Sequence, residues 1–398
     1  MTIDSQFAGG AGAGPGPTVI FGATVVPIVG PPIPDGVVVL DGGRITAVGG
    51  PDTPAPDGAV RIDGSGGLLL PGFVDAHTHI GTLEQGEGWA GDDHDESTGP
   101  VTAQLRAIDA INPADAAFAD ALAGGVLAVG VNPGSCNAIG GQSVALRTAG
   151  RTVDEMCLRS PAGMKSALGE NPKKAYGDKG QYPMTRMGTA AVIRQALAQA
   201  AADLARQRAD GDPLEPVDLG RRALMAVLAG EMPWRQHVHR ADDIATAIRL
   251  ADEFGYRLVI DHGTEAHLLA DVLAERGIPV LLGPLLVGKV KVELRHAEFR
   301  NAAVLARAGV ELSLVTDHPV VPIGQARVQA ALAVREGLDP EAALRALTLN
   351  PARALGVDDR IGSIEPGKDA DLVLWDGDPL QLPSRVMAAF IRGRRVFG

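Results

Sequence analysis

The stretch PGFVDAHTHIG, residues 71–81, places His77 and His79 two positions apart in a largely apolar run. On a β-strand, side chains two residues apart point to the same face of the sheet. Both imidazoles would then enter one small volume, where they either form hydrogen bonds or bind a metal ion. The rest of the chain has to decide between these two interpretations.

Polar residues of the same kinds end four other apolar β-type runs: Lys165 in GMKSAL, His237 and His239 in WRQHVHR, Asp261 and His262 in RLVIDHG, and Asp317, followed by His318, in VELSLVTD. If these runs are strands of one barrel, their carboxyl ends meet at one rim, where barrel enzymes hold their active sites. Imidazole nitrogens and a carboxylate around one space suit a divalent metal such as zinc. The pattern therefore favours a metal site.

The elements that would position these residues alternate between strand and helix. Eight apolar β-type runs occur in the middle of the chain, at residues 72–79, 126–131, 143–148, 163–168, 234–240, 257–263, 278–284 and 310–317. Helical patterns lie between several of them, such as residues 241–254 followed by Gly255, and a helix starting at Pro340 after the cap Asp339. This alternation predicts an α/β protein with a parallel (β/α)8 TIM barrel at residues 71–356.

The two ends of the chain have a different character. Residues 17–70 and 357–398 contain short β-branched runs separated by Gly and Pro, which predicts one small β-sandwich domain built from both termini. Residues 1–16 are rich in Gly, Ala and Pro and are predicted to form a flexible tail. About 70 residues separate the fourth and fifth runs, an insertion expected to shape the mouth of the active site.

Composition limits the classes of partner. The net charge of −12 argues against nucleic acid, because phosphate binding needs a basic surface. No run of about 18 apolar residues is present, so we expect no membrane segment. With two cysteines and no signal-peptide pattern, the chain is expected in the cytoplasm. Assembly into a homo-oligomer is an option that the sequence does not decide.

The motifs PGFVDAHTHIG, HVHRADDI, VIDHG, VTDHP and LTLNPARALGVDDRIGSIEPGKDADLVLWDGDP occur in this order. Together they resemble the metal-dependent amidohydrolase superfamily, closest to its imidazolonepropionase-like members. The resemblance extends over residues 36–398. It implies a (β/α)8 barrel with a small β-sandwich and a site that holds one or two divalent ions, zinc in the first place, with iron and manganese as alternatives.

The resemblance also implies roles for individual residues. His77, His79, His237 and Asp317 match metal ligands, and Asp317 matches the group that takes a proton from water and delivers it to the leaving nitrogen. His262 matches a ligand of a second ion, or a histidine that polarises the substrate when one ion is present. Lys165 lies near the place of a carboxylated lysine that bridges two ions in binuclear members; the alternative is a lysine paired with a carboxylate.

One departure from the family pattern bears on the reaction. Imidazolonepropionases and the aminohydrolases of heterocycles carry a glutamate three residues after the fifth-strand histidine, where this chain has Arg240. An arginine does not exchange protons at neutral pH. This disfavours imidazolonepropionate hydrolysis and ring deamination.

Substrate recognition is assigned to residues around the predicted mouth. His239 is a candidate because it points the same way as His237, and a buried hydrogen-bonded residue is the alternative. Arg240, Lys289 and Arg295 are candidates because the cations of Arg240 and of the basic loop GKVKVELRHAEFR would bind a substrate carboxylate. A solvated loop is the alternative. Glu231 is interpreted as a structural residue at the entrance of the fifth strand, and Cys136 lacks a base at motif spacing that would make it a nucleophile.

The sequence therefore predicts a metal-dependent hydrolase of a C–N amide bond in a linear amide, peptide or lactam, with Asp317 as general base and acid. Expected substrates are small-molecule or peptide amides, such as N-acyl amino acids or cyclic amides with a carboxylate. Alternatives are an imidazolonepropionase-type or aminohydrolase activity, hydrolysis of a lactone or phosphotriester, and a metal-free barrel without catalysis.

Overall fold

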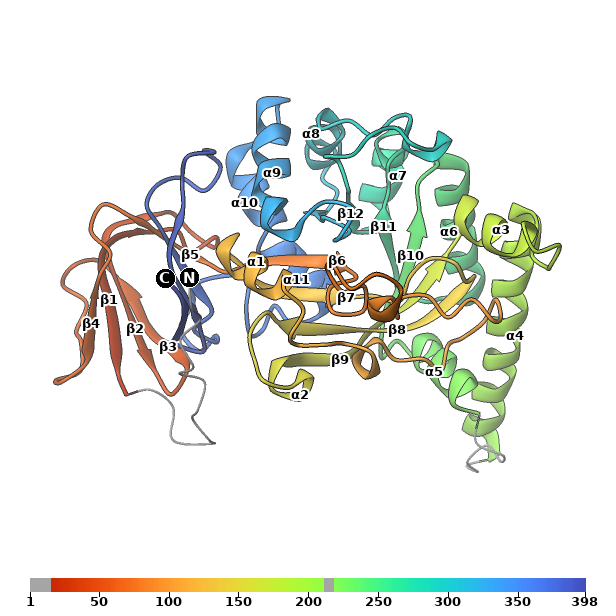
Figure 1. The fold of residues 1–398 in the computed structure, drawn as a ribbon, viewed down its shortest axis with the longest axis horizontal. Coiled ribbons are helices and arrows are strands. Elements are labelled where there is room, and N and C mark those ends of the chain that lie inside the picture. The colour runs from red at the N-terminus through yellow and green to blue at the C-terminus, as the bar shows by residue number, and fades with distance from the viewer. Residues whose placement is uncertain (1–15, 211–217) are drawn as a thin grey trace.

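A computed structural model describes residues 16–210 and 218–398. Strands from both termini form a sheet at one side, and the middle of the chain forms a larger body of strands and surrounding helices (Figure 1). The flexible tail predicted for residues 1–16 lies, apart from Gly16, outside the described residues. None of the described helices is long and apolar enough to cross a membrane.

The terminal sheet has the strand order β16-β15-β14-β5-β1-β2-β3, and β4 pairs with the first half of β1. Its strands are β1 (Thr18–Val25), β2 (Ile33–Asp41), β3 (Arg44–Gly49), β4 (Val60–Asp63), β5 (Leu68–Pro71), β14 (Leu372–Trp375), β15 (Val386–Ile391) and β16 (Arg394–Phe397). Ile20, Leu40, Leu372 and Phe390 are buried in one cluster, which therefore draws on both ends of the chain. Both termini thus build one β-rich unit, while its description as a sandwich stays a prediction.

The second sheet is a nearly closed barrel of eight strands in chain order. An isolated parallel bridge joins Thr78, at the end of the first strand, to His318, four residues beyond the last strand. The strands are β6 (Phe73–Thr78), β7 (Val126–Val131), β8 (Ile139–Arg147), β9 (Cys157–Ala167), β10 (Trp234–Val238), β11 (Leu258–His262), β12 (Val280–Leu282) and β13 (Leu312–Leu314). All eight predicted runs are strands, and the eight-stranded barrel in a mixed α/β chain is confirmed.

One feature of the predicted barrel is wrong. Strand β8 runs antiparallel to both β7 and β9, whereas the sequence predicts eight parallel strands. Only residues 132–138 connect β7 to β8, and a parallel neighbour needs a crossover of about a dozen residues or more. The start of β8 therefore lies at the rim where the other seven strands end, and Arg147 at its end lies at the opposite rim.

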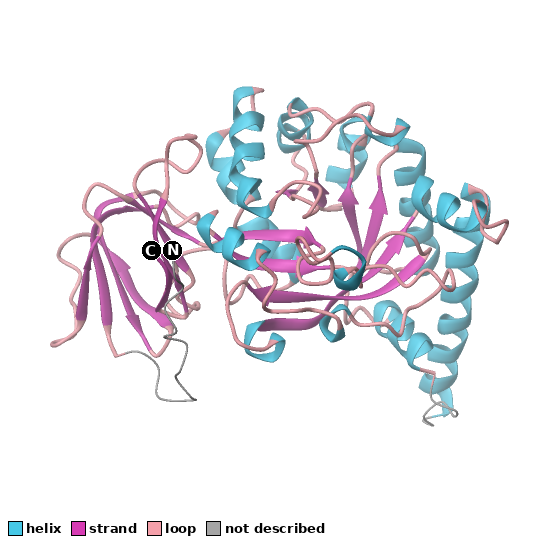
Figure 2. Ribbon diagram, viewed as in Figure 1, coloured by secondary structure: helices cyan, strands magenta, loops and turns pink. Residues whose placement is uncertain are grey.

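Helices surround the barrel strands (Figure 2). They are α1 (Ala117–Ala123), α2 (Val153–Met156), α3 (Glu170–Gly177), α4 (Arg186–Asp210), α5 (Leu219–Leu228), α6 (Ala241–Phe254), α7 (Ala270–Glu275), α8 (Arg300–Arg307), α9 (Ala326–Arg335), α10 (Pro340–Ala346) and α11 (Leu349–Leu355). Helix α6 ends at Gly255 in the left-handed conformation, and the Asp339 side chain caps α10 by accepting a hydrogen bond from the Ala342 amide. Both match the stop and start signals in the sequence.

A buried ion-pair cluster joins the barrel to the region just before β14. Arg147 donates from Nε to Oδ2 of Asp371 over 2.8 Å and from Nη2 to Oδ2 of Asp369 over 2.6 Å. Arg360 also reaches Asp369, from Nη2 over 2.8 Å. The terminal sheet is therefore fixed to the barrel at the rim away from the predicted site.

Candidate metal centre

The predicted ligands come together at the rim formed by the ends of β6, β10, β11 and β13. Their side chains form two groups in which the nitrogen and oxygen donors lie within 4.8 Å of one another. The first group comprises His77, His79 and Asp317, and the second comprises His237, His239 and His262. Strands far apart in the sequence thus deliver six donors to one place, which is the spatial arrangement that the sequence predicts.

In the first group, two imidazoles face one carboxylate. Oδ1 of Asp317 lies 3.4 Å from Nε2 of His77 and 3.4 Å from Nε2 of His79. Nδ1 of His79 lies 2.9 Å from the carbonyl oxygen of Asn132, which can only accept, so Nδ1 carries the proton. In a neutral His79 ring, Nε2 then carries a lone pair that faces Oδ1 of Asp317, which is also an acceptor. A cation bound between these two atoms would accept both lone pairs.

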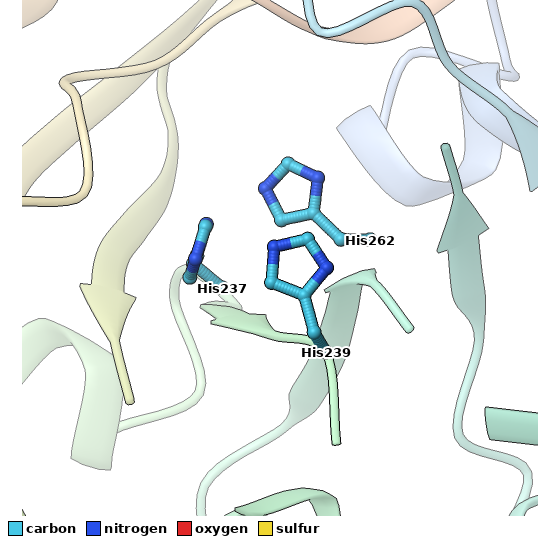
Figure 3. Close-up of side chains that lie close together, drawn as sticks. All are labelled: His237, His239 and His262. Carbon is cyan, nitrogen blue, oxygen red and sulfur yellow. The ribbon is translucent and has the colours of Figure 1, made fainter. Parts of the chain in front are cut away.

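In the second group, three imidazoles surround one space (Figure 3). Nδ1 of His262 donates to the carbonyl oxygen of Gly283 over 2.8 Å, and Nδ1 of His239 lies 2.8 Å from Oγ1 of Thr264. Nδ1 of His237 is buried and has no hydrogen-bond partner among the described residues. An unpartnered buried nitrogen is costly, so this group too fits a bound cation.

Lys165, from β9, lies against the first group. Its Nζ is 3.1 Å from Nε2 of His77 and 3.8 Å from Oδ2 of Asp261, and the side chain is fully buried. Burial lowers the pKa of Lys165 to about 8, although the charge of Asp261 acts in the opposite direction. A buried lysine with a lowered pKa is the kind of amine that reacts when a carbonyl compound reaches it.

Two residues beneath the ligands were not assigned a role from the sequence. Oδ2 of Asp261 lies 3.0 Å from Nδ1 of His77, and Oδ1 of Asp261 accepts from Nε and Nη2 of Arg235 at 2.9 and 2.8 Å. Arg235 also donates to the carbonyl oxygen of Ala76 over 2.9 Å. A carboxylate behind a ligand histidine orients the ring and makes it a better donor. For Arg235 the sequence does contain a signal, since it precedes His237 by two positions and its side chain therefore points to the same face of the strand.

The protonation states suit metal binding at neutral pH. Burial, helped by neighbouring positive groups, holds the pKa values of His77, His237 and His239 well below the usual range, and burial lowers the pKa of His262 to about 4. Burial alone would raise the pKa of Asp317, but His262 and His79 hold it well below its usual range. Neutral imidazoles and an ionised carboxylate are the forms that bind metal ions.

The backbone at two of these positions is strained. His262 has φ 73° and Asp317 has φ 54°, both in the left-handed region that residues with a Cβ avoid. Each costs about 1–2 kcal/mol, and such strain concentrates at functional sites. These two conformations turn the last residue of β11 and the residue three beyond β13 toward the shared space.

A loop after β6 places His94 beside His79 of the first group. The ring of His94 lies 5.3 Å from that of His79, measured between centroids, and its Nδ1 and Nε2 lie 2.5 Å from Asp92 and 3.1 Å from Asp95. Burial alone would lower the pKa of His94, but its hydrogen bond to Asp95 and the nearby acidic charges raise it to about 9. Beside this loop lies a cavity of about 280 Å³ lined by His94, Asp95, Arg106 and Asn137, among others.

The remaining predicted residues lie further from these groups. Arg240 forms two hydrogen bonds with Asp242, Arg295 reaches Glu265 at 3.4 Å, and Lys289 is exposed. Glu231 precedes β10, and its carbonyl oxygen accepts from Arg159. The backbone amide of Cys136 donates to Asp95, and burial raises the pKa of the thiol to about 12.

Two other residues border the second group instead. Nδ2 of Asn171, from the start of α3, lies 3.4 Å from Nε2 of His237, and its Oδ1 accepts from Nζ of Lys291 over 3.2 Å. Lys291 also pairs with the buried Glu293 over 3.2 Å. Of the insertion between β9 and β10, the segment around Asn171 therefore borders the site, as expected for its role at the mouth. Within the basic loop, Lys291 is the cation that touches this border.

Comparison with known proteins agrees with these motifs. A model of the amidohydrolase family matches residues 225–395. The crystal structure of an amidohydrolase from Thermotoga maritima MSB8 has a TM-score of 0.92 and 45% identity, covering 96% of this chain and 99% of that chain. An imidazolonepropionase from Sphingopyxis alaskensis is 28% identical over 377 residues, which cover 89% of this chain and 90% of that protein.

A further curated relative is longer. Amidohydrolase tasK from Hapsidospora irregularis is 30% identical over 391 residues, and the match covers 91% of this chain but 40% of tasK. The chain thus spans less than half of that relative's length. The resemblance identified from the sequence motifs is confirmed by the family model and by the matching amidohydrolase structure. The chain belongs to the amidohydrolase family as an imidazolonepropionase-like member, and it is a hydrolase that acts on carbon–nitrogen bonds.

Proposed function

We propose that this protein hydrolyses an amide bond in a metal-dependent reaction at the rim that holds the two donor groups. The observation that carries the proposal is the position of Asp317 Oδ1, 3.4 Å from Nε2 of both His77 and His79. The proposed ligands are His77, His79, Asp317, His237 and His262, with Lys165 as a carboxylated bridge if two ions are present. Zinc is the favoured ion, since imidazole and carboxylate donors suit it.

A bound divalent ion supplies a Lewis acid and lowers the pKa of a water molecule to about 7. Asp317 is ionised at neutral pH and can accept a proton from the attacking water. It can then return this proton to the leaving nitrogen, which must be protonated before the C–N bond breaks. Asp317 therefore serves as base and then as acid in the same turnover.

The hydrogen bond of His262 bears on its role. Nδ1 of His262 donates its proton in a hydrogen bond to the carbonyl oxygen of Gly283. Nε2 of the neutral ring therefore has a lone pair and no proton to donate. This supports His262 as a metal ligand over a histidine that polarises the substrate through a hydrogen bond. His79 is held in the same way by Asn132.

For the substrate, we propose an amide, peptide or lactam that carries a carboxylate. The basic loop that contains Lys289, Lys291 and Arg295 borders the mouth, and Lys291 is its member that reaches Asn171 beside His237. A carboxylate bound there would form charge-assisted hydrogen bonds. The imidazolonepropionase relatives favour a cyclic amide as the second candidate, although Arg240 replaces the expected glutamate and is paired with Asp242.

The test is metal analysis followed by a substrate panel. The purified protein is analysed for zinc, iron and manganese, stripped with a chelator and reloaded with each ion. N-acyl amino acids, dipeptides, lactams and imidazolonepropionate are then compared with lactones and phosphotriesters. Chelator-sensitive amide hydrolysis supports the proposal. Hydrolysis of esters alone, or a protein that binds no metal and turns over no substrate, would refute it.

A further inference from the structure

His239 has no assigned ligand role in the proposed centre, yet its surroundings are those of a ligand. We propose that His239 joins His237 and His262 as the third imidazole of a three-histidine metal site. This inference rests on the proposed function, because it concerns one half of the same metal centre.

Strand geometry brings His239 to the site. His237 is on β10 and His239 follows its last residue, so the two side chains lie two positions apart and share the inward face. His77 and His79 have the same spacing at the end of β6, on the first group. Each group therefore contains a pair of histidines from one strand end and one donor from another strand.

The contacts of His239 leave one nitrogen available. The side chain is buried, and Nδ1 is satisfied by Oγ1 of Thr264 at 2.8 Å. Among the described residues, no hydrogen bond to Nε2 of His239 is present, and its donor atoms lie within 4.8 Å of those of His237 and His262. A ring that is held through Nδ1 and free at Nε2 is oriented in the way that ligand histidines are.

The neighbouring rings support a shared ion. The ring centroids of His237 and His239 are 4.9 Å apart, those of His237 and His262 are 4.4 Å apart, and those of His239 and His262 are 4.9 Å apart (Figure 3). Nδ1 of His237 is buried without a partner among the described residues, so this ring has a nitrogen that an ion could bind. A single cation would satisfy all three rings at once.

Three protein ligands with one open position is the pattern of catalytic zinc sites. A three-histidine set reaches this number without Lys165. The ion held there would thus not depend on carboxylation of the lysine, in contrast to a second site built from two histidines and a bridge.

The experiment measures metal binding directly. Wild-type protein and variants are stripped and titrated with Co²⁺ and Zn²⁺, and stoichiometry, affinity against a chromophoric chelator and the visible Co²⁺ spectrum are recorded. His239→Asn keeps a polar group near Thr264 and removes the Nε2 donor, and His239→Gln is a second variant. The controls are Thr264→Val, which removes only the contact to Nδ1, and His267→Gln, which removes a nearby imidazole outside the group.

We expect His239→Asn to bind one ion fewer than the wild type when metal is limiting. The affinity of the variant should be at least tenfold weaker, and its Co²⁺ spectrum should change. His267→Gln should bind metal as the wild type does. Thr264→Val should fall between them. If the wild type holds one ion, weaker binding in His239→Asn supports the proposal. Wild-type stoichiometry, affinity and spectrum in folded His239→Asn and His239→Gln would overturn it. A wild type that binds no metal would instead refute the proposed function.

Discussion

Asp261 and His77 meet beneath the candidate metal centre, with Oδ2 of the carboxylate 3.0 Å from Nδ1 of the ring. Both side chains are fully buried, and Arg235 holds the other carboxylate oxygen from β10. The position of His77 thus depends on an ion pair between two neighbouring strands. This pair gives the first prediction.

Replacing Arg235 with Met should destabilise the protein by about 3–5 kcal/mol, because the buried carboxylate of Asp261 loses its counter-charge. Asp261→Asn, which removes that charge, should restore part of the stability in the double variant. Denaturant unfolding measures both, and Arg151→Ala, which breaks an exposed pair with Glu155, is the control with no measurable change. Wild-type stability in Arg235→Met would contradict a structural role for the pair.

Asp317→Asn should lower kcat by roughly 10²–10⁴-fold, the usual contribution of a general acid or base. The amide can still occupy the carboxylate's place but does not accept a proton at neutral pH. Metal content, measured in the same preparation, separates a proton-transfer role from simple loss of the ion. Near-normal turnover with bound metal would rule out the proton-transfer role.

Lys165→Met should weaken metal binding if the lysine is a carboxylated bridge. Protein reloaded in ¹³C-bicarbonate should then give a carbamate signal in the ¹³C spectrum, and this signal should be absent from the variant. The result would contradict a bridge if both proteins, or neither, give this signal and metal stoichiometry is unchanged. Lys165 would then only pair with neighbouring groups.

Lys291→Ala should raise KM for a substrate with a carboxylate by roughly 10- to 100-fold, since a hydrogen bond to a charged group contributes about 1.5–3 kcal/mol. Lys289→Ala is the matched control, because Lys289 is exposed in the same loop. The amide analogue of that substrate, which lacks the charge, should not distinguish the variants. Equal effects of both substitutions would point to the general charge of the loop.

Cys136 should alkylate slowly below pH 11. Burial, followed by the charge of Asp95, raises the pKa of its thiol to about 12 from an ordinary value of 9.0. At pH 9 the thiolate fraction is then about one in a thousand instead of about one half, because each pH unit below the pKa reduces it tenfold. Iodoacetamide rates in a Cys157→Ala background, followed from pH 8 to 12, test this. A plateau near pH 9 would contradict it.

The sequence predicts the strands well, and it predicts that their polar end residues gather at one rim, because both depend on local patterns. Apolar β runs, glycines after helices and a histidine pair at i and i+2 are readable without the fold. The reversal of β8 had a weaker signal, since the predicted runs 126–131 and 143–148 leave eleven residues between them, only slightly fewer than a parallel crossover needs. Loop length, in that case, outweighs the rhythm of apolar runs.

Other parts of the site depend on register and loop conformation. That Arg235 pairs with Asp261 follows from the alignment of β10 with β11, which no local pattern specifies. The choice of Lys291 rather than Lys289 or Arg295 beside His237 depends on how the loop after β12 folds. For His239 the two-residue spacing predicts the same face as His237, but it does not distinguish a substrate contact, a buried hydrogen-bonded residue and a metal ligand.

The cluster of Arg147, Asp369 and Asp371 has a consequence for folding during synthesis. Arg147 and Asp371 are separated by 224 residues, so on the ribosome the arginine leaves the tunnel long before its partner exists. At roughly 5–20 residues per second, this interval is about 10 to 45 s. During that time the Arg147 side chain on β8 has no carboxylate partner, so burying it would leave an unpaired charge. This end of the barrel is therefore expected to close only when translation is nearly complete.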